Sequence, residues 1–256
     1  MKITFLGTGA HDYAKSLATD FRDVFDNDAR RSSALLLGES YLIDCGDHIL
    51  DELRIAGVDI TKITDIFNTH QHSDHFNPEN LAKIASEVAG GIRLWVREDA
   101  EVPSIPGVSI VRMMPFVRYE VGCDLFITGM PANHKPSVFP QHFILETCEK
   151  KLFYGCDGGW LLNETYSYMR KAKFDLMVLD CTVGDYVGDF RLGEHNSIPM
   201  IRLMLPSFAT TSVITDKTQI FLSHIAPSLH APHAETEKIA RDIGCILAYD
   251  GLTVEI

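Results

Sequence analysis

A histidine-rich segment directly after an apolar strand constrains this chain more than any other feature. The segment NTHQHSDHF at residues 68–76 carries His70, His72, Asp74 and His75, and the run ITDIF before it is typical of a buried strand. Imidazole and carboxylate groups bind Zn²⁺ in proteins, and they also suit Mn²⁺ or Fe²⁺. His70 and His72 lie two positions apart, so both side chains point to the same side of an extended segment. The first pair can therefore serve one ion while Asp74 and His75 reach another.

Two metal ions need more ligands than one strand end supplies, so the remaining ligands should come from other strand ends. Three residues fit this position, because each follows an apolar run: His134 in TGMPANHKP, Asp157 in KLFYGCDGGW and His224 in TQIFLSHIAP. A lone histidine after a strand is more often a surface residue than a ligand, so none is assigned on its own. For residues 68–76, the alternative is a polar loop or a helix-capping cluster that happens to be rich in histidine.

The length and composition favour a single domain over residues 1–256. Hydrophobic residues make up 46% of the chain, which is ample for a core. No apolar run approaches the ~20 residues that span a bilayer, and the start MKITFLGTGAHD reads as a first strand rather than a signal peptide. The six cysteines are scattered without a CxxC pair, as is typical of thiols in a reducing compartment. We therefore expect a cytoplasmic protein without a membrane segment, which could form a homodimer.

The net charge limits the class of partner. The chain has 23 Lys and Arg against 35 Asp and Glu, a formal net charge of −12, and no basic tract. Long nucleic acids are bound through many phosphate contacts from Lys and Arg, so we do not expect this protein to bind a long nucleic acid. A small anionic substrate stays compatible with this charge, because bound metal cations can dominate the local field.

Short strands alternate with helical segments along the chain, which predicts mixed sheets packed into layers with helices outside. Candidate strands lie at 2–6, 33–38, 40–44, 63–69, 92–96, 108–112, 124–129, 139–147, 150–155, 175–180, 218–222, 245–249 and 252–256. Candidate helices lie at about 47–56, 78–89, 162–171, 198–205 and 233–243. Turn chemistry predicts hairpins at Gly38, near Glu149 and at Asp250-Gly251, the last a dipeptide suited to a type I′ turn.

The segment THQHSDH matches the HxHxDH motif of metallo-β-lactamase-fold hydrolases, and the ligand candidates that follow it come in that family's order. The resemblance runs from MKITFLGTGA through YLIDCGD to FLSHIAPSLH, which is nearly the whole chain. It implies an α/β (α+β) fold, a four-layer αββα metallo-β-lactamase sandwich of two mixed sheets flanked by helices, with two metal ions at one edge. It also implies the ligand sets: His70, His72 and His134 for the first ion, Asp74, His75 and His224 for the second, and Asp157 as a bridge between both.

Within that superfamily, the chain resembles the phosphodiesterase branch, which includes the transfer-RNA 3′-processing endonucleases and a phosphoribosyl cyclic phosphodiesterase. ARRSSALLL resembles that branch's entry to the second strand, and GEHNSIPMI resembles its extra catalytic-histidine motif, which implies a catalytic role for His195. Two features of the branch are missing. Residues 11–32 contain none of the cysteines of the cyclic phosphodiesterase's structural zinc loop, and the long basic, glycine-rich arm of the endonucleases is absent from the sequence.

Three further residues are weaker candidates for the site. Asp44 in YLIDCGD is either an acid that orients a ligand histidine or a turn-capping residue. Asp180 in LMVLDCTVGD either faces the cleft or is a polar strand terminus. His230 in SLHAPH could line the substrate pocket, or it lies on the surface where the last helix begins. Trp95 and Trp160 are assigned to the core.

Together these features predict a dinuclear metal-dependent hydrolase, specifically a phosphodiesterase that acts on a small or cyclic phosphodiester. Two divalent ions per chain, Zn²⁺ first with Mn²⁺ or Fe²⁺ as alternatives, would share a water and give hydroxide near neutral pH. His195 precedes a helix start marked by Asn196 and Pro199, so it could protonate the leaving oxygen as general acid, and Asp74 is counted with it as catalytic. The alternatives are an acyl-bond hydrolase (a thioesterase or lactonase), an RNA-processing endonuclease and a non-catalytic metal-binding module.

Overall fold

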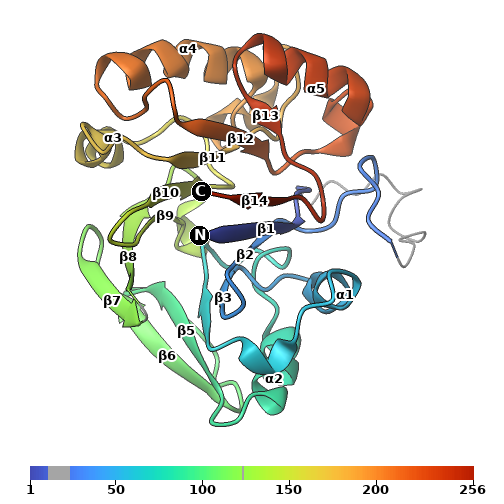
Figure 1. The fold of residues 1–256 in the computed structure, drawn as a ribbon, viewed down its shortest axis with the longest axis vertical. Coiled ribbons are helices and arrows are strands. Elements are labelled where there is room, and N and C mark those ends of the chain that lie inside the picture. The colour runs from blue at the N-terminus through green and yellow to red at the C-terminus, as the bar shows by residue number, and fades with distance from the viewer. Residues whose placement is uncertain (11–23, 123) are drawn as a thin grey trace.

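Two mixed sheets of seven strands each form the centre of the protein. The structure is a computed structural model that describes residues 1–10, 24–122 and 124–256 (Figure 1). In spatial order, the first sheet consists of β14 (Thr253–Glu255), β1 (Lys2–Gly7), β2 (Ala34–Leu37), β3 (Tyr41–Ile43), β4 (Asp65–Phe67), β5 (Ile92–Arg97) and β6 (Val108–Met113). The second consists of β13 (Ile246–Leu247), β12 (Gln219–Ser223), β11 (Leu176–Asp180), β10 (Lys151–Gly155), β9 (Gln141–Glu146), β8 (Leu125–Pro131) and β7 (Arg118–Gly122).

Helices cover the outer face of each sheet, which gives four layers (Figure 1). The first sheet carries α1 (Ile49–Ile55) and α2 (Pro78–Glu87), and the second carries α3 (Asn163–Met169), α4 (Ile198–Thr210) and α5 (His233–Asp242). One apolar cluster fills the space between the sheets, and one more lies under the helices on each side. The expected αββα sandwich is therefore confirmed.

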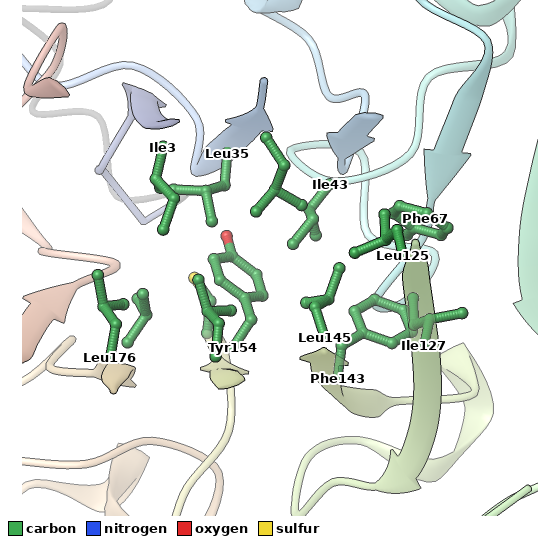
Figure 2. Packing of buried hydrophobic residues seen from close by; sticks show 14 of the residues in the cluster. Ile3, Leu35, Ile43, Phe67, Leu125, Ile127, Phe143, Leu145, Tyr154 and Leu176 are labelled. Atoms are coloured by element: carbon green, nitrogen blue, oxygen red, sulfur yellow. The ribbon is translucent and has the colours of Figure 1, made fainter. Parts of the chain in front are cut away.

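Alternation along the strands supplies apolar side chains to both faces of each sheet. Leu35 and Leu37 point into the space between the sheets, whereas Leu36 packs with the cluster under α1 and α2. Figure 2 shows Leu35 pointing across this space toward Tyr154 of the second sheet. Strands that are buried on both faces read as continuous apolar runs, which is why they can be recognised in the sequence.

All thirteen predicted strands and all five predicted helices have a counterpart in the structure. The hairpins at Gly38 and near Glu149 are confirmed by the antiparallel pairs β2–β3 and β9–β10. The sequence failed to predict β7, because RYEVG is polar and lies exposed at a sheet edge. The helix expected at 198–205 continues through Pro206, since Phe208 of its next turn is buried at 2% exposure. Within the described ranges, no helix is long and apolar enough to cross a membrane.

The predicted hairpin at Asp250-Gly251 is wrong. β13 and β14 belong to different sheets, so the chain between them crosses from the second sheet to the first. The buried carboxylate of Asp250 fixes this crossing by accepting hydrogen bonds from Thr8 N at 2.9 Å, Thr8 Oγ1 at 2.7 Å and Arg31 N at 2.7 Å. Gly251 has a φ of +85° and Asp250 has no positive φ, so the pair does not form a type I′ turn, which needs both.

The topology gathers several strand ends at one edge of the sandwich. Strands β3 to β6 run parallel in the first sheet, and β10 to β13 run parallel in the second. β8 has the same direction as β10, because each pairs antiparallel with β9 between them. Carboxyl ends of parallel strands lie at the same edge of a sheet, where ligands of such sheets usually bind. Side chains that follow these strands are therefore brought together although they are far apart in the sequence.

Candidate metal centre

Three predicted site residues stand just after strands in a backbone conformation that is uncommon for residues other than glycine. Asp44 follows β3, Asp157 lies shortly after β10, and His224 follows β12, with φ values of +65°, +53° and +58°. Asp and His adopt positive φ more readily than most residues, and such strained positions cluster at functional sites. The buried strands fix where each segment ends, and the sharp turn leaves each polar side chain buried at the shared edge.

The predicted ligands of the first ion lie together. Nε2 of His70 is 2.9 Å from Nδ1 of His72 and 3.0 Å from Oδ2 of Asp157. Nε2 of His134 is 3.1 Å from the same Nδ1 of His72. One ligand atom from each of the four residues lies within 4.8 Å of the others, which is compatible with a single cation between them.

The predicted ligands of the second ion form an adjacent group. The Nε2 atoms of His75 and His224 are 3.2 Å apart. Oδ2 of Asp74 lies 3.3 Å from Nε2 of His75. Oδ2 of Asp157 lies 3.5 Å from Nε2 of His75 and 3.4 Å from Nε2 of His224. The same oxygen lies beside His70 of the first group, so Asp157 occupies the position expected of a bridging ligand.

The hydrogen bonds of the imidazoles indicate that this cluster suits cations. Nδ1 of His75 donates to Oδ2 of Asp44 at 2.7 Å, and Nδ1 of His224 donates to Oγ1 of Thr182 at 2.8 Å. In the neutral rings both Nε2 atoms then carry lone pairs, which face each other. Oδ1 of Asp157 is buried and accepts no hydrogen bond of good geometry from the described residues. Divalent cations would satisfy these atoms, so the residues fit two metal ions, and the nitrogen and oxygen donors suit Zn²⁺.

Two acids hold ligand histidines in place from behind. Asp44 contacts His75 and also accepts from Thr69 N at 2.7 Å and Thr69 Oγ1 at 2.8 Å. Asp180 lies with Oδ2 at 3.2 Å from Nδ1 of His224. An acid behind a ligand histidine fixes its tautomer and ring orientation. Asp44 thus has the orienting geometry that was one of its two alternatives. Asp180 faces the cluster, with Oδ2 beside His224 and also 3.2 Å from Nδ1 of His195.

Burial and neighbouring charges set the protonation states of the cluster. Burial, helped by His75, lowers the pKa of His70 to about 3, so its imidazole is neutral. Burial by itself would raise the pKa of Asp157, but His224 and His70 hold it well below its usual range. Burial lowers the pKa of His75 and His224, but the carboxylates around them outweigh it and raise the pKa well above its usual value for His75 and to about 9 for His224. Neutral imidazole and ionised carboxylate are the forms that bind metal ions, so a cation bound by these two rings would displace their protons.

His195 lies at the border of this cluster, next to its acids. Nδ1 of His195 lies 3.1 Å from Oδ1 of Asp157, 3.2 Å from Oδ2 of Asp180 and 3.1 Å from Oγ1 of Thr182. Burial lowers the pKa of His195, but contacts with the two carboxylates outweigh it and raise the pKa to about 11. Its side chain is 14% exposed and lines the cavity above the cluster. His195 also lies close enough to Asp157, Asp180 and His224 to form a third group of potential ligands.

The cavity contains residues that the sequence did not single out. It is lined by Ala10, His72, Ser73, Asp74, His134, Asp157, Thr182, Arg191, Glu194, His195 and His224. Ser73, Thr182 and Glu194 lie within segments that were singled out for other residues, and Arg191 lies four positions before His195, so nearness to a predicted site residue in the sequence was the only available signal. His230 lines a separate depression with Arg30, where its Nε2 donates to the carbonyl oxygen of Cys181 at 2.8 Å.

Replacing Gly46 by alanine is expected to disturb the second group of ligands. A Cβ on Gly46 would lie 1.7 Å from the backbone oxygen of Asp74, so that segment would have to move. We expect the free energy of unfolding to fall by about 1–3 kcal/mol and the metal content to fall by up to one ion per chain. Denaturant unfolding and elemental analysis measure both, with Gly193→Ala as the control, because a Cβ there meets no atom within 4 Å. Wild-type metal content in Gly46→Ala would contradict the placement of Asp74.

Comparison with known proteins supports the fold and the metal motif. Residues 28–77 match the family model of the Metallo-beta-lactamase superfamily. "Zinc phosphodiesterase ELAC protein 1" of Bos taurus is 38% identical over 79 residues, which cover 30% of this chain and 18% of that protein. "Ribonuclease Z" of Methanococcus maripaludis is 41% identical over 76 residues, which cover 29% of this chain and 21% of that protein. The matched segments thus span only about a fifth of the length of these curated relatives.

Solved structures resemble the chain over its full length. The metallo-beta-lactamase fold protein YhfI from Bacillus subtilis has a TM-score of 0.76 at 15% identity and covers 100% of this chain and 99% of its own. A diphosphatase from the PhnP family has a TM-score of 0.72 at 18% identity, with 100% and 98% covered. Human tRNase Z, short form (ELAC1), has a TM-score of 0.67 at 19% identity, with 100% and 99% covered. The superfamily match across the histidine motif and the full-length likeness in fold together make this chain a metallo-β-lactamase-fold protein.

Proposed function

We propose that this protein is a dinuclear metal-dependent hydrolase that cleaves small or cyclic phosphodiesters. One observation carries the proposal: two groups of histidine and aspartate ligand atoms share Oδ2 of Asp157, and His195 lies beside them in the same cavity. Relatives of the matched segment are named zinc phosphodiesterase and ribonuclease Z, which supports hydrolysis of phosphate esters. The single domain over residues 1–256, the homodimer and the cytoplasmic location stay predictions.

The residues of the cavity would have two roles in phosphodiester hydrolysis, metal binding and proton transfer. One ion would be held by His70, His72 and His134, and the other by Asp74, His75 and His224. Asp157 would contact both ions. When bound by these residues, two divalent ions would lower the pKa of a shared water and would stabilise negative charge on phosphate oxygens. The carboxylates of Asp157 and Asp180 face Nδ1 of His195, which leaves Nε2 to give a proton to the departing oxygen.

The type of bond cleaved is tested with two chromogenic substrates, a phosphodiester that releases p-nitrophenolate and a thioester that releases p-nitrothiophenolate. We expect protein loaded with Zn²⁺ or Mn²⁺ to give a larger rate enhancement over the uncatalysed reaction with bis(p-nitrophenyl) phosphate than with S-(p-nitrophenyl) thioacetate. The reverse order would favour an acyl-bond hydrolase on the same fold. Full metal content without turnover of either ester, or of a panel of cyclic phosphodiesters, would favour a metal-binding module.

A second candidate function is RNA processing, which the names of the ribonuclease Z relatives favour. The net charge of −12 and the absence of a basic, glycine-rich arm oppose it. We expect weak binding of precursor transfer RNA, because few Lys and Arg are available to replace counterions on the phosphates. Filter binding at several salt concentrations measures this. Tight, salt-sensitive binding together with cleavage at the 3′ end would reverse the order of the two candidates.

A further inference from the structure

The segment before His195 carries the most exposed large apolar side chain among the described residues. Phe190 begins the short 3₁₀ helix η3 (Phe190–Gly193) and is 88% exposed. Val187, just before it, is 75% exposed. Single exposed apolar residues are common, but Arg191, the residue directly after Phe190, lines the cavity above the predicted metal ligands, which places this segment next to the candidate site.

This segment is tied to His195 and therefore has a defined place beside the metal centre. The carboxylate of Asp189 accepts hydrogen bonds from the backbone N of Arg191 at 2.8 Å and from its Nε at 2.9 Å. The backbone oxygen of Arg191 accepts from the N atoms of Glu194 and His195, both at 2.9 Å. Phe190 and Arg191 thus cannot shift far without moving the residue proposed as general acid.

Arg191 supplies a positive charge to a cavity otherwise lined by histidines, acids and small residues. It is the only Lys or Arg among the described residues of the cavity lining. Its guanidinium carbon lies 5.0 Å from the centre of the Phe190 ring, within cation–π range. Within the described chain, Asp189 accepts the only side-chain hydrogen bond of Arg191, through Nε, so both Nη groups are available to an anion.

Trp160 adds a second exposed aromatic ring near the same segment. It was expected in the core, as Trp95 is, but it is 47% exposed while Trp95 is 3% exposed. The preceding residue, Gly159, packs against the segment of His195: a Cβ on Gly159 would lie 3.2 Å from the backbone N of His195. The prediction that Trp160 lies in the core is therefore wrong, and the segment that carries it packs against the segment that carries Phe190 and His195.

We propose that Phe190 and Arg191 form a substrate subsite that selects phosphodiesters with a flat aromatic ring, such as a nucleobase, on the group that stays attached to the phosphate after cleavage. The ring of the substrate stacks on Phe190, and Arg191 pairs with an oxygen of the reacting phosphate. Stacking on an aromatic side chain is favourable for any base, because every base has a π-face. The subsite requires a ligand with both a negative charge and a flat ring, and a purely apolar partner would leave Arg191 unused. This inference rests on the proposed phosphodiesterase function.

Two substrates with one leaving group separate the subsite from the chemistry. Thymidine 5′-(p-nitrophenyl phosphate) carries a base, and methyl p-nitrophenyl phosphate does not. We expect Phe190→Ala to lower the ratio of kcat/KM for the first over the second by roughly 5- to 100-fold, and Phe190→Tyr to restore it. Arg191→Ala should lower kcat/KM on both substrates, because both contain the phosphate. Leu203→Ala, which removes a 68% exposed side chain of α4, should leave the ratio at the wild-type value.

Other results would overturn the subsite. An unchanged ratio in Phe190→Ala, or an equal loss on both substrates, would mean that Phe190 does not contact the base. A smaller particle in sedimentation velocity with an unchanged ratio would make Phe190 a subunit contact instead. If the wild type hydrolyses neither substrate, the proposed function fails separately. Titration calorimetry with thymidine 5′-monophosphate then tests the subsite by itself. Equal affinity of the wild type and Phe190→Ala for this nucleotide would exclude the subsite.

Discussion

Replacement of Asp157 by alanine is expected to remove most of both metal ions and nearly all hydrolytic activity. The Oδ2 atom of Asp157 lies between the two groups of ligand atoms, 3.0 Å from His70 and 3.4 Å from His224. Its loss takes the only shared ligand from both groups and leaves buried imidazoles around a vacated position. Metal ions contribute several kcal/mol to such reactions, so kcat should fall by roughly 10³-fold or more. Elemental analysis of protein purified without chelators measures the metal content.

Two further variants show whether the loss of metal in Asp157→Ala comes from the loss of a bridging ligand or from the loss of any carboxylate. His224→Ala should lose mainly one ion, because His224 is among the predicted ligands of the second ion and not among those of the first. Asp175→Ala should keep both, because that half-exposed carboxylate pairs with Lys150 at 3.2 Å outside the site. Circular dichroism and denaturant unfolding show whether each variant is folded. One ion per chain in the wild type, or wild-type content in folded Asp157→Ala, would refute the dinuclear centre.

Replacement of His195 by alanine is expected to slow the reaction by an amount that depends on the leaving group. A p-nitrophenolate departs as a stable anion, whereas an alkoxide such as a ribose oxygen needs a proton. General acid catalysis contributes ~10²–10⁴-fold, so the loss should reach that size on an alkyl phosphodiester and be much smaller on the nitrophenyl ester. Measurements of kcat/KM on the two substrates, at equal metal loading, give the comparison.

The metal content of His195→Ala checks the role assigned to this residue. Nδ1 of His195 lies beside Asp157 and Asp180, and the same residues could form a metal group with His224. We expect wild-type metal content, because both ions have complete ligand sets without His195. Loss of an ion would make His195 a ligand. Equal losses on both substrates would mean that it positions the phosphate, and His233→Ala, in the separate depression, is the histidine control.

Most helices and strands of this protein depend on local sequence patterns, whereas strand pairing and the placement of strands in sheets depend on contacts between distant residues. Strands such as β11 and helices such as α2 could be predicted, because alternation, apolar runs and capping residues such as Asn77 act within a few positions. Edge strand β7 could not, since its pattern is polar and its pairing with β8 decides its conformation. The sequence supports a hairpin at Asp250 equally well, and only the contacts of its carboxylate with Thr8 and Arg31 place the last two strands in different sheets.

The predicted ligands follow from the sequence by itself, through the dense motif at His70 to His75 and the order of the acids and histidines after it. Their meeting at one point is a property of the tertiary structure: His75 and His224 approach to 3.2 Å although 149 positions separate them. The orienting role of Asp44 and Asp180 and the placement of Arg191 in the cavity depend on such approaches. Parallel strands from two sheets must end at one edge before these side chains can meet, and no local pattern specifies how two sheets pack.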